Sequence, residues 1–534
     1  RHSAAAMLVK TRPSVTTKSL LILGMLKSPH LFLVILITST LPLKAEKAVQ
    51  IGKQKQLFVD HYIIDTLENV SIEVGQAQKY GVVMEPTLPS DFQTGKVHDG
   101  PDGGAGYSFG ESAFCWFFSP HWDEQKKMFR LWYMPSKRKG IGLAYAESKD
   151  GINWTKPMVS KDGKSNIVME PANGAGLDGV TVTIDPSLPY GSSEKYKVAY
   201  FPHPGKCQTH LGYSADGINW KHYNNGNPVT GRAADFSNKI TWDPNRKKYL
   251  LLCRQDFGAA GGVGELRGVR IMEHSKSNDL INHPTAWKTL TKFVLNDPSK
   301  TIVPGSRNVP ERQIHTFPIW YYEGVWFGLT DVLVATDVPV PHGKQDYQTR
   351  HEKGVWEFYM APSRDATNYD FEIAAYPRKP LIPRGPNGSF DKDCARPPAN
   401  IITHNDEHWI YYFATNERWG ARFWDARLAL AKLRMDGFFY IESKNKEGNI
   451  MTKAFILEGD SIEINTDSLS GYIKVEILDQ NGNKLASSKT YRGYDNIRLN
   501  PKWEDHENLN KFKGKMIRLK FTLMNSKIFS FKIN

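Results

Sequence analysis

Short apolar stretches recur along the chain between polar turns, without the 3.6-residue spacing of amphipathic helices. Two stretches are nearly identical: residues 140–154 read GIGLAYAESKDGINW, and residues 209–220 read THLGYSADGINW. Each predicts a strand, then a Ser, a tight Asp-Gly turn whose Gly has a positive φ, and a Trp that folds back beside the strand. Two such copies indicate repeated β-modules, and their period favours a propeller.

The same order of strands recurs further along the chain. An apolar inner strand, a strand rich in Tyr and Trp, and a third strand ending in a turn follow one another. The inner strands of successive modules begin at Glu111, at Asp178, at Asp235, near Glu311 and around Arg396. We therefore predict an all-β fold with a five-bladed β-propeller over residues 46–437. A separate strand at residues 56–65 is expected to complete the last blade.

After residue 437 the pattern changes to short alternating strands and a hairpin turn at residues 479–483. This pattern is typical of a small β-sandwich, which we place at residues 438–534. Such a domain either packs against the propeller and covers strand edges or binds carbohydrate.

The first 45 residues contain no acidic residue and end in the apolar run of residues 31–43, followed by Lys44 and Ala45. A basic start, a short apolar run and a small residue are typical of a secretory signal, here cleaved near Ala45. The run is too short for a membrane span, which needs about 20 residues. We expect a protein exported to the periplasm or the medium, with residues 1–24 as an upstream extension. A retained anchor is the alternative.

Charge and cysteines exclude several classes of function. The formal net charge is +13, and removing the six Lys and Arg of the first 45 residues lowers it to about +7. No basic block indicates nucleic-acid binding. A mildly basic exported protein suits an anionic polysaccharide, or it simply has a basic solvated surface. The four cysteines form no metal-ligand pattern. We expect no cofactor; a structural calcium and the oligomeric state are left open by the sequence.

Charged and polar residues open the predicted inner strands, which converge at one mouth of a propeller's channel. They are Glu111, Asp178, Asp235, Glu311 with Arg312 and His315, and Arg396. Each alone could be an ordinary strand-edge residue. Together, several acids with Arg and His partners match what cleavage of a glycosidic bond requires, namely one carboxyl to protonate the leaving oxygen and another to activate water or attack the sugar.

The order of strands and the S-x-DG-x-x-W turn resemble the five-bladed propeller glycosidases of glycoside hydrolase families 32, 43 and 68. The chain is most similar to a bacterial family-32-like group, which shares the opening LFVDHYII, the ending LALAKLRMDGF and a C-terminal sandwich containing IEINTDSLSGYIKVEILDQNG. The resemblance implies three catalytic acids on the first three inner strands.

By position, those three acids correspond here to Glu111, Asp178 and Asp235. The order departs from the usual Asp, Asp and Glu, and the N-D-P-N-G, R-D-P and E-C motifs of family 32 are missing, which disfavours a fructan substrate. On this resemblance Asp178 is the orienting carboxylate, and the other two form the base and acid pair in an order left open. Substrate-binding groups would be Glu311, Arg312, His315 and Arg396.

Two further sets of residues are candidates for substrate contacts. His98 and Asp99 lie in a Gly-rich loop that either folds over the channel mouth or merely connects strands. Trp419 and Trp424 lie in a loop of the fifth module and either stack on sugar rings or pack inside. His404 and His408 lack a third ligand, so no metal site is predicted.

The sequence thus predicts an exported glycoside hydrolase acting on a plant or algal polysaccharide or oligosaccharide. Two alternatives remain: a glycoside phosphorylase on the same fold, and a carbohydrate-binding propeller without catalysis. Export disfavours the phosphorylase, because phosphorolysis conserves energy mainly inside cells.

Overall fold

The structure is a computed structural model of the whole chain, and it divides into two units, Arg1–Lys47 and Ala48–Asn534. The residues it describes are 47–93, 112–114, 117–136, 141–203, 206, 208–231, 238–256, 267–294, 312–335, 354–371, 379–418 and 426–534. Within these ranges no helix is long and apolar enough to cross a membrane.

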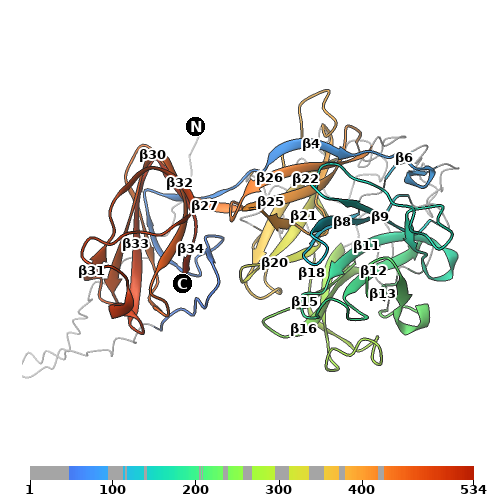
Figure 1. Cartoon of the computed structure of the whole chain (residues 1–534), viewed down its shortest axis with the longest axis horizontal. Helices are drawn as coiled ribbons and strands as arrows, with labels where there is room; N and C mark the ends of the chain where they lie inside the picture. The colour runs from blue at the N-terminus through green and yellow to red at the C-terminus, as the bar shows by residue number, and fades with distance from the viewer. Residues whose placement is uncertain are drawn as a thin grey trace, which may run out of the picture. The chain divides into compact units, whose positions relative to one another are not determined.

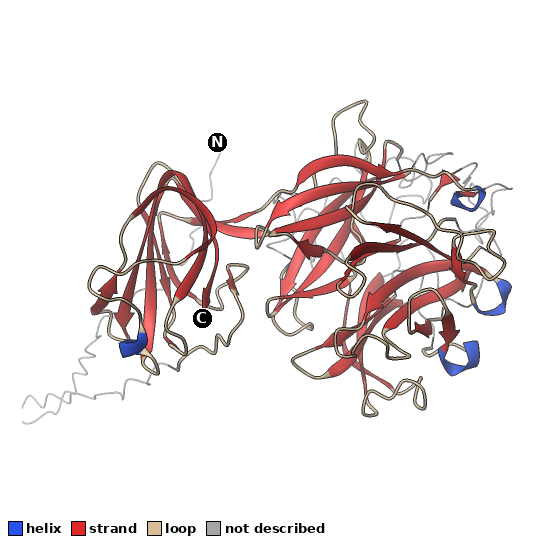
Figure 2. Ribbon diagram, in the orientation of Figure 1, coloured by secondary structure: helices blue, strands red, loops and turns tan. Residues whose placement is uncertain are grey.

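The described chain is built of strands, as predicted, and Figure 2 shows them curling in successive sheets. The 3-10 helices between them are η1 (Pro89–Asp91), η2 (Ala172–Gly174), η3 (Tyr223–Gly226) and η4 (Asn510–Phe512).

Three four-stranded antiparallel sheets follow one another along the chain. The first contains β7 (Phe118–Asp123), β8 (Met128–Tyr133), β9 (Leu143–Ser148) and β10 (Ile167–Met169). The second contains β11 (Gly176–Ile184), β12 (Tyr196–His203), β13 (His210–Ser214) and β14 (Trp220–His222). The third contains β15 (Lys239–Asp243), β16 (Lys248–Asp256), β17 (Arg267–His274) and β18 (Trp287–Val294).

A nine-stranded sheet contains the next two groups of strands, joined through one parallel pair between Trp356 and Cys394. Its first group is β19 (Arg312–Thr316), β20 (Ile319–Tyr322), β21 (Val325–Ala335) and β22 (Gly354–Ser363). Its second group is β23 (Cys394–Arg396), β24 (Ile402–His404), β25 (Glu407–Thr415), β26 (Arg427–Arg434) and β4 (Gln78–Met84). Because the two groups share a sheet, the count of five blades stays a prediction.

An N-terminal strand does complete the last of these groups, but it is not the predicted one. In Figure 1 the blue strand β4 lies beside the orange β26, and the two pair antiparallel from Met84 to Gln78. The assignment of residues 56–65 to this position was wrong. Gln56 and Leu57 pair with the C-terminal strand instead, so they lie in a different sheet. Apolar alternation identifies a strand, but it does not identify the edge with which the strand pairs.

The C-terminal strands form an 11-stranded sheet together with three N-terminal strands. The sheet contains β1 (Gln56–Leu57), β2 (Ile64–Glu68), β3 (Ser71–Val74), β27 (Phe439–Ser443), β28 (Gly448–Thr452), β29 (Phe455–Ile456), β30 (Ile462–Asp479), β31 (Lys484–Ser487), β32 (Tyr491–Leu499), β33 (Met516–Met524) and β34 (Ser526–Ile533). The strand β33 alternates buried and partly buried positions along its length, and its buried side chains join one apolar core with those of β30 and β34. The limits of the two predicted domains stay a prediction.

The two Asp-Gly turns form as predicted. Gly151 and Gly217 have φ of 73° and 77°. The Asp150 side chain accepts hydrogen bonds from the backbone N–H groups of Ile152 and Asn153, and Asp216 does the same one module later. These Asp side chains therefore stabilise the turns.

Each Gly turn packs on aromatic side chains of another module. Tyr411 of β25 donates to the carbonyl of Gly151 at 2.8 Å, and Trp132 of β8 donates to the carbonyl of Gly217 at 2.7 Å. A Cβ on Gly217 would lie 2.4 Å from Trp132, so a side chain there would displace the ring. The conserved spacing of Ser, Asp and Gly within the two copies thus joins neighbouring modules as well as turning the chain.

A third copy of the turn has no Asp-Gly sequence and was therefore not predicted. Residues 363–368 read SRDATN, and Asp365 accepts hydrogen bonds from the backbone N–H groups of Thr367 and Asn368. Ala366 occupies the Gly position with φ of 58° and is fully buried.

Candidate functional site

The end strands β7, β11 and β15 of the first three sheets lie beside one another, and β24 also contacts β7. Hydrogen bonds join them directly. The Asn238 N–H donates to Gly179 at 2.8 Å, the Val182 N–H donates to the Ser119 hydroxyl at 2.9 Å, and the Ala399 N–H donates to Phe118 at 2.8 Å. These strands are therefore the inner strands, as predicted from their apolar sequences.

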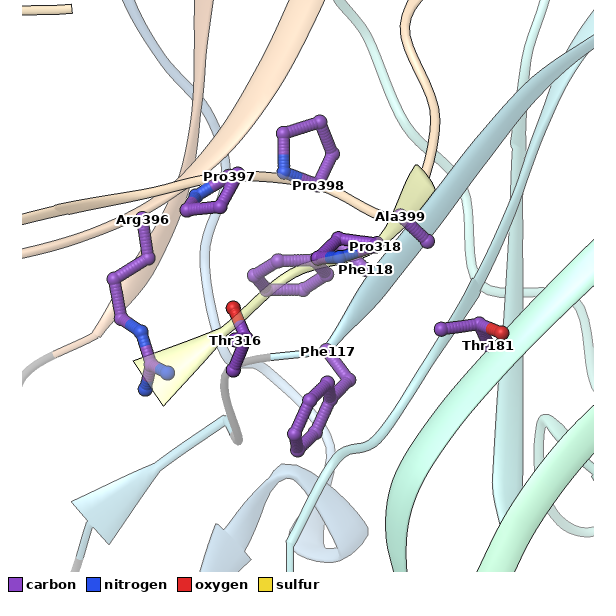
Figure 3. A pocket seen from close by; sticks show the side chains of 9 residues that line it. All are labelled: Phe117, Phe118, Thr181, Thr316, Pro318, Arg396, Pro397, Pro398 and Ala399. Atoms are coloured by element: carbon purple, nitrogen blue, oxygen red, sulfur yellow. The ribbon is translucent and has the colours of Figure 1, made fainter. Parts of the chain in front are cut away.

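A hollow opens where the inner strands come together, and Figure 3 shows the side chains around it. Phe117 and Phe118 contribute aromatic surface, while Arg396, Thr316 and Thr181 contribute polar groups. Its other lining residues are Pro318, Pro397, Pro398 and Ala399. These residues come from four of the strand groups, so the hollow lies on the axis around which the sheets are arranged.

Arg396, a predicted substrate-binding residue, lies in the wall of this hollow and forms a buried ion pair with Asp331 of β21. The Arg396 Nε donates to Asp331 Oδ2 at 2.6 Å, and a second nitrogen contacts the same oxygen. The guanidinium carbon lies 4.2 Å from the centre of the Trp356 ring, close enough for a cation–π interaction. Three elements thus fix the position of the guanidinium group.

Asp331 has few partners for a buried carboxyl. It is fully buried, and beyond Arg396 it accepts one long hydrogen bond, 3.3 Å, from the Thr316 hydroxyl. Its Oδ1 has no hydrogen-bond partner within the described part of the chain. Burial raises the pKa of Asp331 to about 6, because the ion pair and the Thr316 bond only partly offset the loss of water.

Asp178, the predicted orienting carboxylate, lies on β11 three residues before Thr181 of the hollow. Its side chain is 3% exposed, and its Oδ1 accepts the N–H of Gly179 at 2.8 Å. The pairing of β11 with β12 shifts register between Asp178 and Thr181, and Gly179 has φ of 59°. Bulges of this kind redirect side chains and are frequent beside functional sites.

A second polar cluster lies next to the hollow, and in the described part of the chain no carboxylate accepts a hydrogen bond from its Lys and His side chains. Lys239 at the start of β15 donates to the carbonyl of Ala399 at 2.6 Å and to the Asn400 side chain at 2.7 Å. Burial lowers the pKa of Lys239 to about 7. The nitrogen of Asn400 lies 2.9 Å from His121 Nε2, and burial lowers the pKa of His121 to about 4.

The structure describes only part of the predicted site. Asp178 and Arg396 are both close to the hollow, on β11 and β23. Arg312 and His315 lie on β19, but nothing is described of their side chains. The remaining predicted residues lie outside the described ranges; they are Glu111, Asp235, Glu311, Trp419, Trp424, His98 and Asp99.

The continuous inner strand predicted from Glu111 onward is interrupted. Ser112 and Ala113 form β6, which pairs with β5 (Phe92–Gln93) in a separate two-stranded sheet. Phe114 then has φ of 55°, and the inner strand β7 begins only at Phe118. An apolar run did not reveal this break, because a positive φ at Phe is unusual and has no sequence signal.

Sequence reasoning missed Asp331, Thr316 and Lys239. Asp331 had a signal, because it is a single acid within the apolar strand of residues 325–335. A charge at such a position requires a buried partner. The identity of that partner, 65 positions further along the chain, had no signal in the sequence.

The two histidines weighed as metal ligands have other partners. His408 is fully buried and accepts the N–H of Asp436 at 3.0 Å, and burial lowers its pKa to about 3. His404 packs against Trp122, with ring centres 4.1 Å apart. In the described ranges no group of three or more His, Cys, Asp or Glu side chains is arranged to hold a metal ion.

No protein-family model matches the chain, and no curated protein matches it in sequence. Its fold is similar to several solved structures. An N-acetylgalactosamine deacetylase from F. plautii has 12% identity and a TM-score of 0.44, with 68% of this chain and 96% of that chain covered. A structure from the GH130 family of mannoside phosphorylases, described as containing glycoside hydrolases that target β-1,2 mannosidic linkages in Candida mannan, has 13% identity and a TM-score of 0.40, covering 67% and 94%.

An endo-arabinase from Bacteroides thetaiotaomicron has 12% identity and a TM-score of 0.38, covering 60% of this chain and 94% of that chain. These similarities concern the fold, and the function of this protein is inferred from the geometry of the hollow.

Proposed function

We propose that this protein is a glycoside hydrolase that cleaves a plant or algal polysaccharide or oligosaccharide at the hollow between its inner strands. The observation that carries this proposal is the convergence of Phe117, Phe118 and Arg396 on one hollow, with the carboxyl group of Asp178 on the adjoining strand. Aromatic faces pack against sugar rings, and charged groups bind their polar substituents.

The division of roles follows the sequence. Glu111 and Asp235 would be the acid and base pair, and Asp178 would orient the sugar or stabilise charge that develops during bond cleavage. Arg396 would bind a substituent of the sugar, with Glu311, Arg312, His315, Trp419, Trp424, His98 and Asp99 as further contacts. The proposed reaction needs water and no organic cofactor. We further propose export after cleavage near Ala45.

A product screen tests this function. Protein beginning at Glu46 is incubated with a panel of neutral and anionic polysaccharides, and released reducing ends are measured. Asp178→Asn should lower the release at least 100-fold while leaving the circular dichroism spectrum unchanged. Asp162→Asn, an exposed Asp in a loop away from the hollow, is the matched control and should keep full activity.

The alternatives give different results in the same screen. Product release that depends on added phosphate would indicate a phosphorylase. Binding of a polysaccharide without any release, unchanged by Asp178→Asn, would indicate a carbohydrate-binding propeller. Absence of both release and binding would contradict a carbohydrate function altogether.

A further inference from the structure

Arg396 is presented to the hollow by groups that leave it little freedom. Asp331 binds two of its nitrogens, and the guanidinium carbon lies over the Trp356 ring, 4.2 Å from the ring centre. In Figure 3 the guanidinium group lies beside the Thr316 hydroxyl at one side of the hollow. A planar guanidinium with its orientation fixed binds carboxylates well, because it donates two parallel hydrogen bonds to them.

We propose that the hollow takes an acidic sugar unit whose carboxylate pairs with Arg396, and that Asp331 takes up a proton when this sugar binds. This inference rests on the proposed function and names the substrate class of the same site. Asp331 is a positioning residue in this scheme, since it acts on the sugar through Arg396.

The proton uptake follows from charge balance. Among the described residues of the free protein, the carboxylate that the Arg396 guanidinium pairs with is that of Asp331. A sugar carboxylate adds a second negative charge beside the same guanidinium, in a region shielded from water. Two carboxylates that share one site cannot both stay ionised without a large cost, so the one with the higher pKa takes a proton from solvent.

Asp331 is the group suited to take that proton. Its pKa is already raised to about 6 by burial, and its Oδ1 accepts no hydrogen bond from the described residues, so a proton there displaces no partner. A sugar carboxylate resembles an α-carboxyl group, with a pKa of about 3.5, and stays ionised.

The other groups near Asp331 are a buried thiol, two carboxylates with cationic partners and a hydroxyl. Burial raises the pKa of the Cys394 thiol on β23 well above its usual value, so the thiol stays neutral. Asp393, the residue before it, pairs with Lys392 at 2.7 Å. On β22, Glu357 faces Arg384 at 3.5 Å. Among the described side chains of β19, the group that faces Asp331 is the Thr316 hydroxyl, which does not ionise.

Linkage gives the size of the effect. Above pH 6 the affinity for the acidic sugar should rise about tenfold for each unit of decrease in pH, and below pH 6 it should level off, because Asp331 is then protonated before binding. A neutral sugar of the same shape should bind with no such dependence.

The test is calorimetric titration of the wild-type protein with uronic acid trisaccharides and their carboxyl-reduced, neutral counterparts. Each titration is run from pH 5 to pH 8 in two buffers with different ionisation enthalpies, which reports the protons taken up. We expect preference for an acidic trisaccharide, an affinity gain of up to about 100-fold from pH 8 to pH 6, and uptake approaching one proton near pH 7.

Variants separate positioning from simple structural support. Asp331→Asn, which has a fixed neutral group of the same shape, should still bind the acidic sugar but with an affinity that no longer changes with pH. Arg396→Gln should lose the preference for the acidic sugar over the neutral one. Asp162→Asn should behave as the wild type. If Asp331→Asn fails to fold, the number of protons that the wild-type protein takes up on binding tests the inference by itself.

Two results overturn the inference. The first is equal binding of acidic and neutral trisaccharides, or an affinity for the acidic sugar that does not change between pH 6 and pH 8. This result contradicts the inference, but product release in the screen would still support the proposed glycosidase function. Absence of both binding and product release contradicts the inference and the proposed function together.

Discussion

Two buried Asp–Arg ion pairs in this protein have the same kinds of side chains, but the pKa of the Asp is shifted in opposite directions. Asp123 of β7 pairs with Arg130 of β8 within the first sheet, and Asp331 pairs with Arg396 at the hollow. All four side chains are at most 4% exposed. Each guanidinium lies over a Trp ring, Arg130 over Trp132 at 4.7 Å and Arg396 over Trp356 at 4.2 Å.

The difference lies in how many donors each carboxylate has. Asp123 accepts the backbone N–H groups of Gln125 and Lys126, the Tyr196 hydroxyl at 2.8 Å and Arg130. Burial raises its pKa, but these hydrogen bonds outweigh burial, and the pKa of Asp123 is lowered. Within the described residues, Asp331 has only Arg396 and a long hydrogen bond from Thr316 as partners, and burial raises its pKa to about 6.

The comparison shows that an Arg partner alone does not keep a buried carboxylate ionised. At Asp123, two backbone N–H groups and a hydroxyl are the additional hydrogen-bond donors that keep the carboxylate ionised. Such a fully satisfied network stabilises the fold, whereas a carboxyl with too few donors stays responsive to pH and to a ligand.

The largest expected effect comes from removing each Arg. Arg130→Met would leave Asp123 buried without its charge partner and should lower the free energy of unfolding by about 3–5 kcal/mol. Arg396→Met should cost clearly less at pH 5, because Asp331 can hold a proton there. Urea unfolding of both variants at pH 5 measures the difference, and Lys127→Met, which breaks an exposed pair, is the control. If both Arg variants lowered the free energy of unfolding equally at pH 5, the proposed difference between the two ion pairs would be contradicted.

The second expected effect is an opposite pH dependence of stability. The pKa of Asp331 is raised from 3.8 to about 6, so the folded state holds its proton longer than the unfolded state. The wild type should therefore lose about 3 kcal/mol relative to Asp331→Asn as pH rises from 4 to 7. Urea unfolding at several pH values measures this slope.

Asp123→Asn should give the reverse slope. The folded pKa of Asp123 is lowered, so its stabilisation is present above the unfolded pKa and is lost as pH falls through the folded value. The wild type should lose stability relative to this variant below about pH 4. Slopes of the same sign for both variants would contradict the assignment.

A smaller effect is expected where a turn packs on the first pair. A Cβ on Gly217 would lie 2.4 Å from Trp132 and 3.2 Å from Arg130, at a φ of 77°. Gly217→Ala should cost about 2–4 kcal/mol, from overpacking of about 1–3 kcal/mol and the positive φ. Gly163→Ala is the matched control, since φ there is 66° with nothing within 4 Å. Thermal unfolding compares them; similar costs would mean that the contact with Trp132 adds nothing.

The smallest effect is expected at Thr316. Its hydroxyl donates the one further hydrogen bond that Asp331 accepts from the described residues, at 3.3 Å. Thr316→Val should raise the pKa of Asp331 by less than about one unit, since a long neutral hydrogen bond contributes about 1 kcal/mol or less. The pH at which affinity for the acidic trisaccharide levels off should move up accordingly. A downward shift would mean that Thr316 stabilises the protonated carboxyl instead.

The fold was predictable because its signals are local. The apolar strands and the Asp-Gly turns were confirmed, since alternation and a positive φ at Gly are properties of neighbouring residues. The pairing of β4 with β26 was not predicted, because the partners of a strand depend on contacts across hundreds of positions. The turn at Asp365 was missed because Ala366 replaces its Gly.

The site was predictable only in part. Arg396 was singled out because it opens a strand group, and it lines the hollow, while its role in substrate binding stays a prediction. Asp331 was missed because it lies within a strand, where the search for acids at strand starts does not reach. Its pKa is raised because few hydrogen-bond donors among the described residues contact its carboxyl group. The sequence lists the side chains of the protein, but it does not show which of them come into contact.

The most direct test of the contrast between the two pairs is carbon-13 NMR titration of protein with labelled Asp carboxyl groups. Asp331→Asn and Asp123→Asn identify the two signals by their loss. We predict one carboxyl that titrates near pH 6 and is lost in Asp331→Asn, and a second that stays ionised below pH 4 and is lost in Asp123→Asn. If the signal lost in Asp331→Asn titrates below pH 4 as well, the two pairs are equivalent and the account of the hollow is contradicted.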